Sequence, residues 1–117
     1  MSTVTIGANI YFNGTAGTAQ TELRIDSGYT QNQIFRVGSH SMEIVITNLN
    51  GTFGNGLRIA FDDSTAIAAG QYIVVPGNQH PVVMHPNVKH AIYVQRDVSS
   101  DVAFSIMVVR KNSFNSF

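Results

Sequence analysis

The sequence contains no cysteine and no tryptophan among its 117 residues. Without cysteine the chain can form no disulfide, no thiolate metal site and no cysteine nucleophile. Charge is also scarce, because 12% of the residues are charged, about half the usual share in soluble domains. Seven basic residues balance seven acidic ones, so the basic excess typical of nucleic-acid and anionic-membrane binders is missing. We therefore expect neither a nucleic acid nor a membrane as a partner.

A secretory start and a bilayer-spanning apolar run are also missing. The first residues, MSTVTIGANIYF, lack the basic start and the continuous apolar stretch of a signal peptide. The long uncharged stretch 64–88 contains Gln, Asn, His and Pro and is too polar to span a bilayer. These features predict a soluble protein made in the cytoplasm. A surface with few charges and no net charge repels its own copies weakly, which favours association.

What the chain does contain is an apolar pattern with a period of two, the period of a β-strand. In the run 42–48, Met, Ile and Ile alternate with Glu, Val and Thr, and the runs 57–61, 91–96 and 102–108 alternate similarly. These runs are rich in β-branched and aromatic residues, as strands prefer. Turn-forming residues separate them, at Asn13-Gly14, Asn50-Gly51, Asn55-Gly56, 76–78 and 98–101.

The pattern predicts an all-β fold, an antiparallel β-sandwich of roughly seven to nine short strands that is jelly-roll-like or Ig-like. No ten-residue window carries an amphipathic helical stripe, and 62–70 forms one short helical turn at most. We expect a single domain over 1–117, with extended arms at 1–33 and 112–117. The predicted strands are 3–12, 20–26, 33–38, 42–48, 56–61, 71–75, 80–85, 91–96 and 102–110.

Three of the four histidines, His80, His85 and His90, follow one another at intervals of five residues. Residues five apart point to opposite faces of a strand, and Pro81 and Pro86 argue against a helix. A metal site would require the loop after His85 to bring His85 and His90 together, without cysteine or a nearby carboxylate. We interpret the three as partly exposed side chains beside turns. A remaining hypothesis is that they titrate at an intersubunit contact, between about pH 5 and 8.

The acidic pair Asp62-Asp63 follows a predicted strand and precedes Ser64. Carboxylates in sandwich loops can bind calcium, but two adjacent acids are too few for a full site. We interpret the pair as the opening of a turn. Arg58, Arg96 and Arg110 lie in or beside strands, and we expect them to pair with acids across the sheet.

The sequence contains no motif of a hydrolytic enzyme, because neither a Gly-x-Ser-x-Gly nucleophile elbow nor a P-loop is present. Ser39, His40 and Ser41 are interpreted as polar residues at a junction between strands. Asn13 and Asn50 each begin a glycosylation sequon, but hairpin turns explain both better. The sequence therefore assigns no catalytic, cofactor-binding or metal-ligating residue, and we predict a protein that is not an enzyme and holds no cofactor.

The second half of the chain contains three sequence patterns in a recognisable order. Leu57 to Asp63 forms an arginine-bearing apolar strand ending in acids, Tyr72 to Gly77 has the pattern Tyr-x-Val-x-Pro-Gly, and Ile92 to Arg110 contains Ile-Tyr-Val, a polar turn and a last apolar strand. This order of strand and turn patterns resembles that of small tailed-bacteriophage virion proteins. These are β-sandwiches that decorate heads or serve as tail and adaptor parts. The resemblance covers somewhat under half of the chain and carries over no catalytic residue.

The resemblance implies a non-enzymatic virion structural protein, foremost one that decorates or stabilises a tailed-phage capsid. The expected partners are other virion proteins, a major capsid or tail protein, and further copies of the chain in a homo-oligomer such as a trimer. The expected location is the virion, after synthesis in the host cytoplasm. Alternatives are a tail, fibre or head-tail adaptor protein and a carbohydrate- or receptor-binding sandwich, with a small cupin-like metal enzyme as a distant third.

Overall fold

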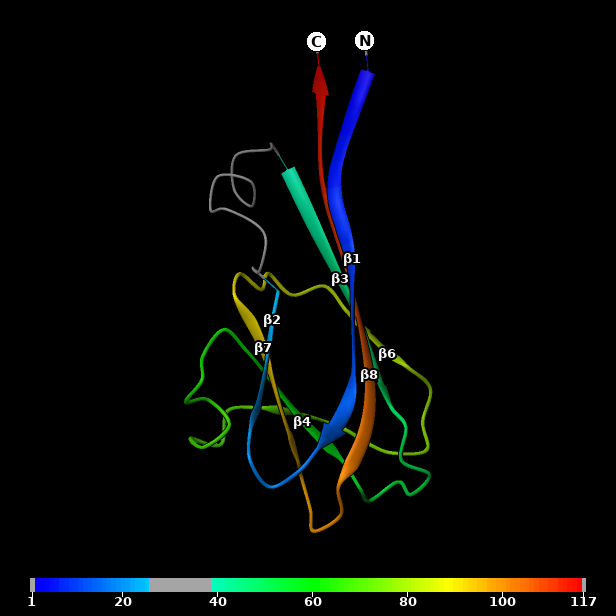
Figure 1. The fold of residues 1–117 in the computed structure, drawn as a ribbon, viewed down its shortest axis with the longest axis vertical. Coiled ribbons are helices and arrows are strands. Elements are labelled where there is room, and N and C mark those ends of the chain that lie inside the picture. Colours follow the sequence, from blue (N-terminus) through cyan, green and yellow to red (C-terminus); the bar gives the residue numbers. More distant parts are fainter. Residues whose placement is uncertain (1, 26–38, 117) are drawn as a thin grey trace.

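The structure, a computed structural model, describes residues 2–25 and 39–116 (Figure 1). The described residues form strands and no helix, and none of them belongs to a helix that could cross a membrane. The strands are β1 (Ser2–Ala16), β2 (Thr21–Arg24), β3 (Ser39–Asn48), β4 (Leu57–Phe61), β5 (Ile73–Val75), β6 (Val82–Met84), β7 (Ala91–Arg96) and β8 (Val102–Ser116).

These eight strands form two four-stranded antiparallel sheets. Sheet A has the order β1-β8-β3-β6, and sheet B has the order β2-β7-β4-β5. Among the described strands, each one lies in the other sheet from its predecessor, except β5, which follows β4 within sheet B. This alternation between two sheets is the topology of a jelly roll, whereas an Ig domain distributes its strands differently. The predicted β-sandwich is confirmed, in its jelly-roll form.

The core lies between the sheets and consists of the alternate residues that the period-two pattern marked. Side chains from both sheets are almost completely buried, and each contributes about 1.5–3 kcal/mol by leaving water. Sheet A supplies Ile44, Ile46, Val102, Ile106 and Val108, and sheet B supplies Leu57, Ile59, Val75, Ile92 and Val94.

The predicted arms are largely strands of the sheets. Residues 2–16 pair with 102–116 along their whole length, from Ser2 opposite Ser116 to Ala16 opposite Val102. Figure 1 shows the resulting ladder, with the two chain ends together at one tip of the molecule. The described parts of 1–33 and 112–117 are therefore strand residues held by a neighbouring strand, apart from the short β1–β2 loop and Ile25.

Several predicted strand limits were wrong. Asn13-Gly14 lies inside β1 instead of forming a turn, because both residues pair with β8. The strand predicted at 80–85 is reduced to Val82–Met84, since Pro81 and Pro86 lack the N–H that a ladder needs. The strand predicted at 33–38 lies outside the described residues.

The segment 62–71 covers the outer face of sheet B. Its Ala66 and Ile67 are buried against Ala60, Ala91 and Tyr93, and together they form a second, smaller apolar cluster. The segment consists of successive hydrogen-bonded turns, from Asp63 O to Ala66 N up to Ala66 O to Gln71 N. The expectation of one short helical turn at most agrees with these hydrogen-bonded turns, which pack on part of one face of the sandwich.

Candidate functional site

The three clustered histidines are exposed and lie outside the strands. His80 precedes β6, His85 follows it and His90 precedes β7, which matches the interpretation as side chains beside turns. In the part of the chain that the structure describes, no group of three His, Asp or Glu side chains could hold a metal ion. The structure does bring a carboxylate to one of them, because His85 Nε2 lies 3.4 Å from Glu43 Oε2 on the adjacent strand. No residue pattern indicates this contact, since Glu43 lies far from His85 along the chain.

Asp62 holds the backbone of residues 89–91, where the chain enters β7. Its carboxylate accepts hydrogen bonds from the backbone N–H groups of Lys89 (2.8 Å), His90 (2.7 Å) and Ala91 (3.2 Å), and its own N–H donates to the Ala91 carbonyl oxygen (2.8 Å). The residue has a positive φ of 62°, a conformation that Asp tolerates better than most residues. Asp62 is therefore a structural clamp whose oxygens are engaged by the chain itself.

Asp63 has the turn role that the sequence predicted. Thr65 donates its hydroxyl (2.6 Å) and its backbone N–H (2.8 Å) to the Asp63 carboxylate. These bonds favour the ionised form and lower the pKa of that carboxyl. The two neighbouring acids thus stabilise two different turns and do not converge on a common cation.

Where the structure describes their side chains, the arginines do pair with acids, but these acids lie in the loop after β7 and not across the sheet as predicted. Arg58 Nε donates to Asp97 Oδ1 at 2.8 Å, and Arg96 Nη1 donates to Asp101 Oδ1 at 2.6 Å. The side chain of Arg110, as well as those of Ser39, His40 and Ser41, lies outside the described part. These pairs tie β4 and β7 to the loop that follows β7.

Of the three described tyrosines, Tyr11 is the one with a well-exposed ring. The Arg58 guanidinium lies 4.5 Å from the centre of the Tyr72 ring. Tyr93 is 6% exposed, and burial together with the hydrogen bond from its hydroxyl to Glu22 (3.0 Å) raises its pKa. Tyr11 is 62% exposed on β1, and Tyr29 lies outside the described residues.

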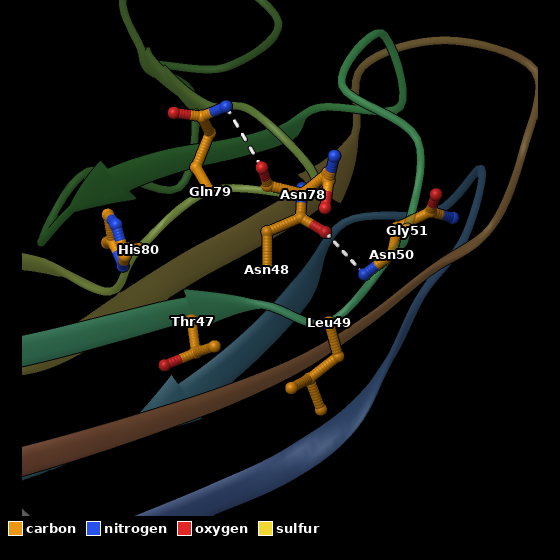
Figure 2. Close-up of a pocket in the computed structure, with 8 residues that line it drawn as sticks. All are labelled: Thr47, Asn48, Leu49, Asn50, Gly51, Asn78, Gln79 and His80. Carbon is orange, nitrogen blue, oxygen red and sulfur yellow. Dashed lines mark hydrogen bonds between the residues drawn. The ribbon is translucent and has the colours of Figure 1, made fainter.

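A hollow of about 520 Å³ lies beside the loop that joins β3 to β4, and Figure 2 shows its lining. It is lined by Thr47, Asn48, Leu49, Asn50, Gly51, Asn78, Gln79 and His80. Asn48 is 5% exposed, and its amide group donates to the carbonyl oxygens of Asn55 and Val75, each at 2.9 Å. Its Oδ1 accepts the N–H of Asn50 at 2.9 Å. The hydrogen-bonding groups of the Asn48 side chain, which lines the hollow, therefore hold two loops together.

The open features of sheet A are its β1 edge and its outer face. Among the described residues β1 pairs on one side only, with β8, over fifteen residues. Tyr11 on β1 and Val83 on β6, 52% exposed, both lie on this sheet. Sheet B, by contrast, has its outer face covered by 62–71. Among the described residues, sheet A therefore presents an open strand edge and partly apolar outer surface.

Comparisons with known proteins found a similar fold but no match in sequence. No family model matches the chain, and no curated protein matches it in sequence. Among solved structures, the fold is similar to that of a chain from Bacillus endospore appendages, described as a novel family of disulfide-linked pili. The TM-score is 0.59, and the match covers 96% of this chain and 91% of that chain at 12% identity. At that identity the likeness shows the shared fold alone.

Proposed function

We propose that the chain is a non-enzymatic structural subunit whose copies join through the open edge of β1. An edge strand presents a row of unpaired N–H and C=O groups, which can accept a strand from another chain. The observation that carries this proposal is that β1 has fifteen residues without a single charge or proline. It is a long edge without the features that normally prevent pairing.

The other three edges have such features. β5 and β6 contain three residues each, with Pro76 after β5 and prolines on both sides of β6. β2 has four residues, two of which are Glu22 and Arg24. Short strands, prolines and charges all discourage edge pairing. Association through main-chain hydrogen bonds is therefore directed to β1.

A second β1 is a suitable partner for this edge. Two copies related by a two-fold axis place their β1 strands antiparallel, the better-bonded arrangement. The pair forms one continuous eight-stranded sheet from two copies of sheet A. This two-fold contact is a different form of homo-oligomer from the trimer that the resemblance suggested.

The likeness to a pilus chain supports an extracellular structural role, with one difference in how copies are held together. The similar Bacillus chain belongs to disulfide-linked pili, whereas this chain has no cysteine. An assembly of this chain must therefore depend on strand pairing and side-chain packing, and thiol reductants will leave it intact.

Adjacent prolines in β1 test the edge directly. Successive N–H groups of a strand point alternately to its two sides, so one of Gly14→Pro and Thr15→Pro removes a donor of the β1–β8 ladder and the other removes a donor of the open edge. The ladder variant leaves a carbonyl oxygen of β8 without its donor and should lose about 1–3 kcal/mol of folding stability. The edge variant should melt closer to the wild type but weaken association about tenfold or more, measured by analytical ultracentrifugation.

Each proline variant is the matched control of the other. Wild-type protein that sediments as a 12.7 kDa monomer up to its solubility limit would overturn the proposal. So would two variants that both fold and associate as the wild type does.

A second candidate function is decoration of a tailed-bacteriophage particle. It is favoured by the order of sequence patterns in 57–63, 72–77 and 92–110, which lie in or beside β4, β5, β7 and the first part of β8. In that case a major capsid or tail protein supplies the surface that the chain coats. Co-sedimentation of the chain with phage particles at a fixed stoichiometry supports this function, and sedimentation of self-assembled chain without particles supports the first.

A further inference from the structure

Four apolar side chains form a row across the outer face of sheet A. The register places Tyr11 opposite Met107, Met107 opposite Val45, and Val45 opposite Val83. Directly paired residues lie on the same face of a sheet. The neighbouring residues Ile44, Ile46, Ile106 and Val108 are buried in the core, so this row faces outward. We call these four residues the outer row.

The outer row is partly exposed and bordered by polar residues. Tyr11 and Val83, at its ends, are 62% and 52% exposed, and Val45 and Met107 are partly buried. Asn13, Ser105 and Thr47 form the next row on one side. On the other side lie Glu43 and His85, which are in contact, while the half-buried Val109 beside Glu43 extends the apolar strip. An apolar strip between polar rims has the composition of a protein–protein interface.

The two outer faces of the sandwich differ in what covers them. On sheet B, Ala66 and Ile67 pack on the outward residues Ala60 and Tyr93. On sheet A, Tyr11 and Val83 at the ends of the outer row are 62% and 52% exposed. Within residues 2–25 and 39–116, the chain thus packs a segment on part of the outer face of sheet B and leaves the ends of the apolar strip on sheet A open.

We propose that the outer face of sheet A packs against the same face of a second copy. Glu43 and His85, 3.4 Å apart, are the charge-bearing groups among the described side chains of this face. Because both lie at one rim, the rest of the described face carries no charge that would repel a second copy. Three strands about 4.8 Å apart over the ten residues of β3, with the three residues of β6 beside them, give roughly 500 Å² on each copy. Two such faces reach about 1,000 Å², the minimum expected of a specific interface.

The positions of the rims select the symmetry axis of the contact. A two-fold axis parallel to the outer row lays the Glu43–His85 rim of one copy over the Asn13, Ser105 and Thr47 rim of the other. An axis parallel to the strands would instead place the two Glu43 carboxylates at the same rim. The first arrangement avoids like charges, and it brings Val83 of one copy over Val83 of the other.

This contact goes beyond the pairing of β1 edges and does not depend on it. If both contacts form, each copy has two different two-fold neighbours, one through its edge and one through its face. Two distinct isologous contacts produce either a closed four-copy ring or an open chain. The fold therefore contains the surfaces needed for a linear assembly without any covalent link.

Val45→Lys tests the face without altering an edge, because β3 lies between β8 and β6. A lysine can lay its stem along the sheet surface, but its charge must lose water in the proposed contact. We expect the dissociation constant of the face contact to rise about tenfold or more. Ala68→Lys adds the same charge on the exposed segment over sheet B and should leave association unchanged. Combined with the edge proline, Val45→Lys should yield the 12.7 kDa monomer.

Crosslinking tests the axis, since a cysteine introduced into this cysteine-free chain is its sole thiol. A short bismaleimide should link Val83→Cys into dimers, and Ala68→Cys should give few. Dimers in equal yield from both variants, or in neither, would contradict the proposed axis. If Val45→Lys lowers the melting temperature without changing the mass of the assembly, the chain itself covers the outer row and the proposal is wrong.

Discussion

Gly77→Ala is expected to reduce the stability of the chain by about 3 kcal/mol or more, a larger loss than most single substitutions cause. A Cβ at this position would overlap the backbone oxygen of Thr52 and would lie 2.9 Å from that of Asn50. Both oxygens are held in place, because Asn55 N–H donates to Thr52 O (3.1 Å) and Asn78 N–H donates to Asn50 O (2.8 Å). The obstruction is backbone on backbone, so no side-chain rotation can relieve it.

Thermal unfolding followed by circular dichroism measures this effect, with a decrease of about 10 °C or more in melting temperature. Gly51→Ala is the matched control, since an added Cβ there meets no atom within 4 Å. A Gly77→Ala variant that melts with the wild type would show that the loops after β3 and β5 do not touch as described.

Asn48→Ala is the second substitution with a large expected effect, about 3 kcal/mol. It leaves the carbonyl oxygens of Asn55 and Val75 and the N–H of Asn50 without their partner in a site that is 5% exposed. Buried polar groups that lose a partner cost about 1–3 kcal/mol each, which makes the loss exceed that of an ordinary hydrogen bond.

Chemical denaturation gives the free energy of unfolding for this comparison. Gln79→Ala is the control, because Gln79 lines the same hollow but is exposed and bonds only to the neighbouring Asn78 oxygen. Its effect should stay within about 0.5 kcal/mol. Equal stabilities for the two variants would mean that Asn48 does not hold the loops together.

The fold class could be predicted from the sequence because burial in a sandwich follows the period of two. Ile44, Ile46, Ile106 and Val108 all lie on the face that the alternation marked. The residues at which strands begin and end were harder to predict, since they depend on pairing with the neighbouring strand. Asn13-Gly14 has the composition of a turn, yet it continues β1 because Ser105 and Phe104 lie opposite.

The interactions of side chains with remote backbone could not be predicted. Asp62 was correctly placed in a turn, but its partners are the backbone N–H groups of Lys89, His90 and Ala91 at the start of β7, which no residue pattern reveals. Asn48 looked like an ordinary strand end. The outer row was hidden for a similar reason, because its members Tyr11, Val45, Val83 and Met107 come from four strands and meet only through the sheet register.

Amide hydrogen exchange along β1 in assembled protein tests the central claim most directly. In an isolated chain, alternate N–H groups of β1 face β8 and the others face solvent, so protection alternates along the strand. In an assembly joined through this edge, successive amides from Ile10 to Thr15 should all be protected. Alternating protection that persists in the assembled protein would contradict pairing through β1.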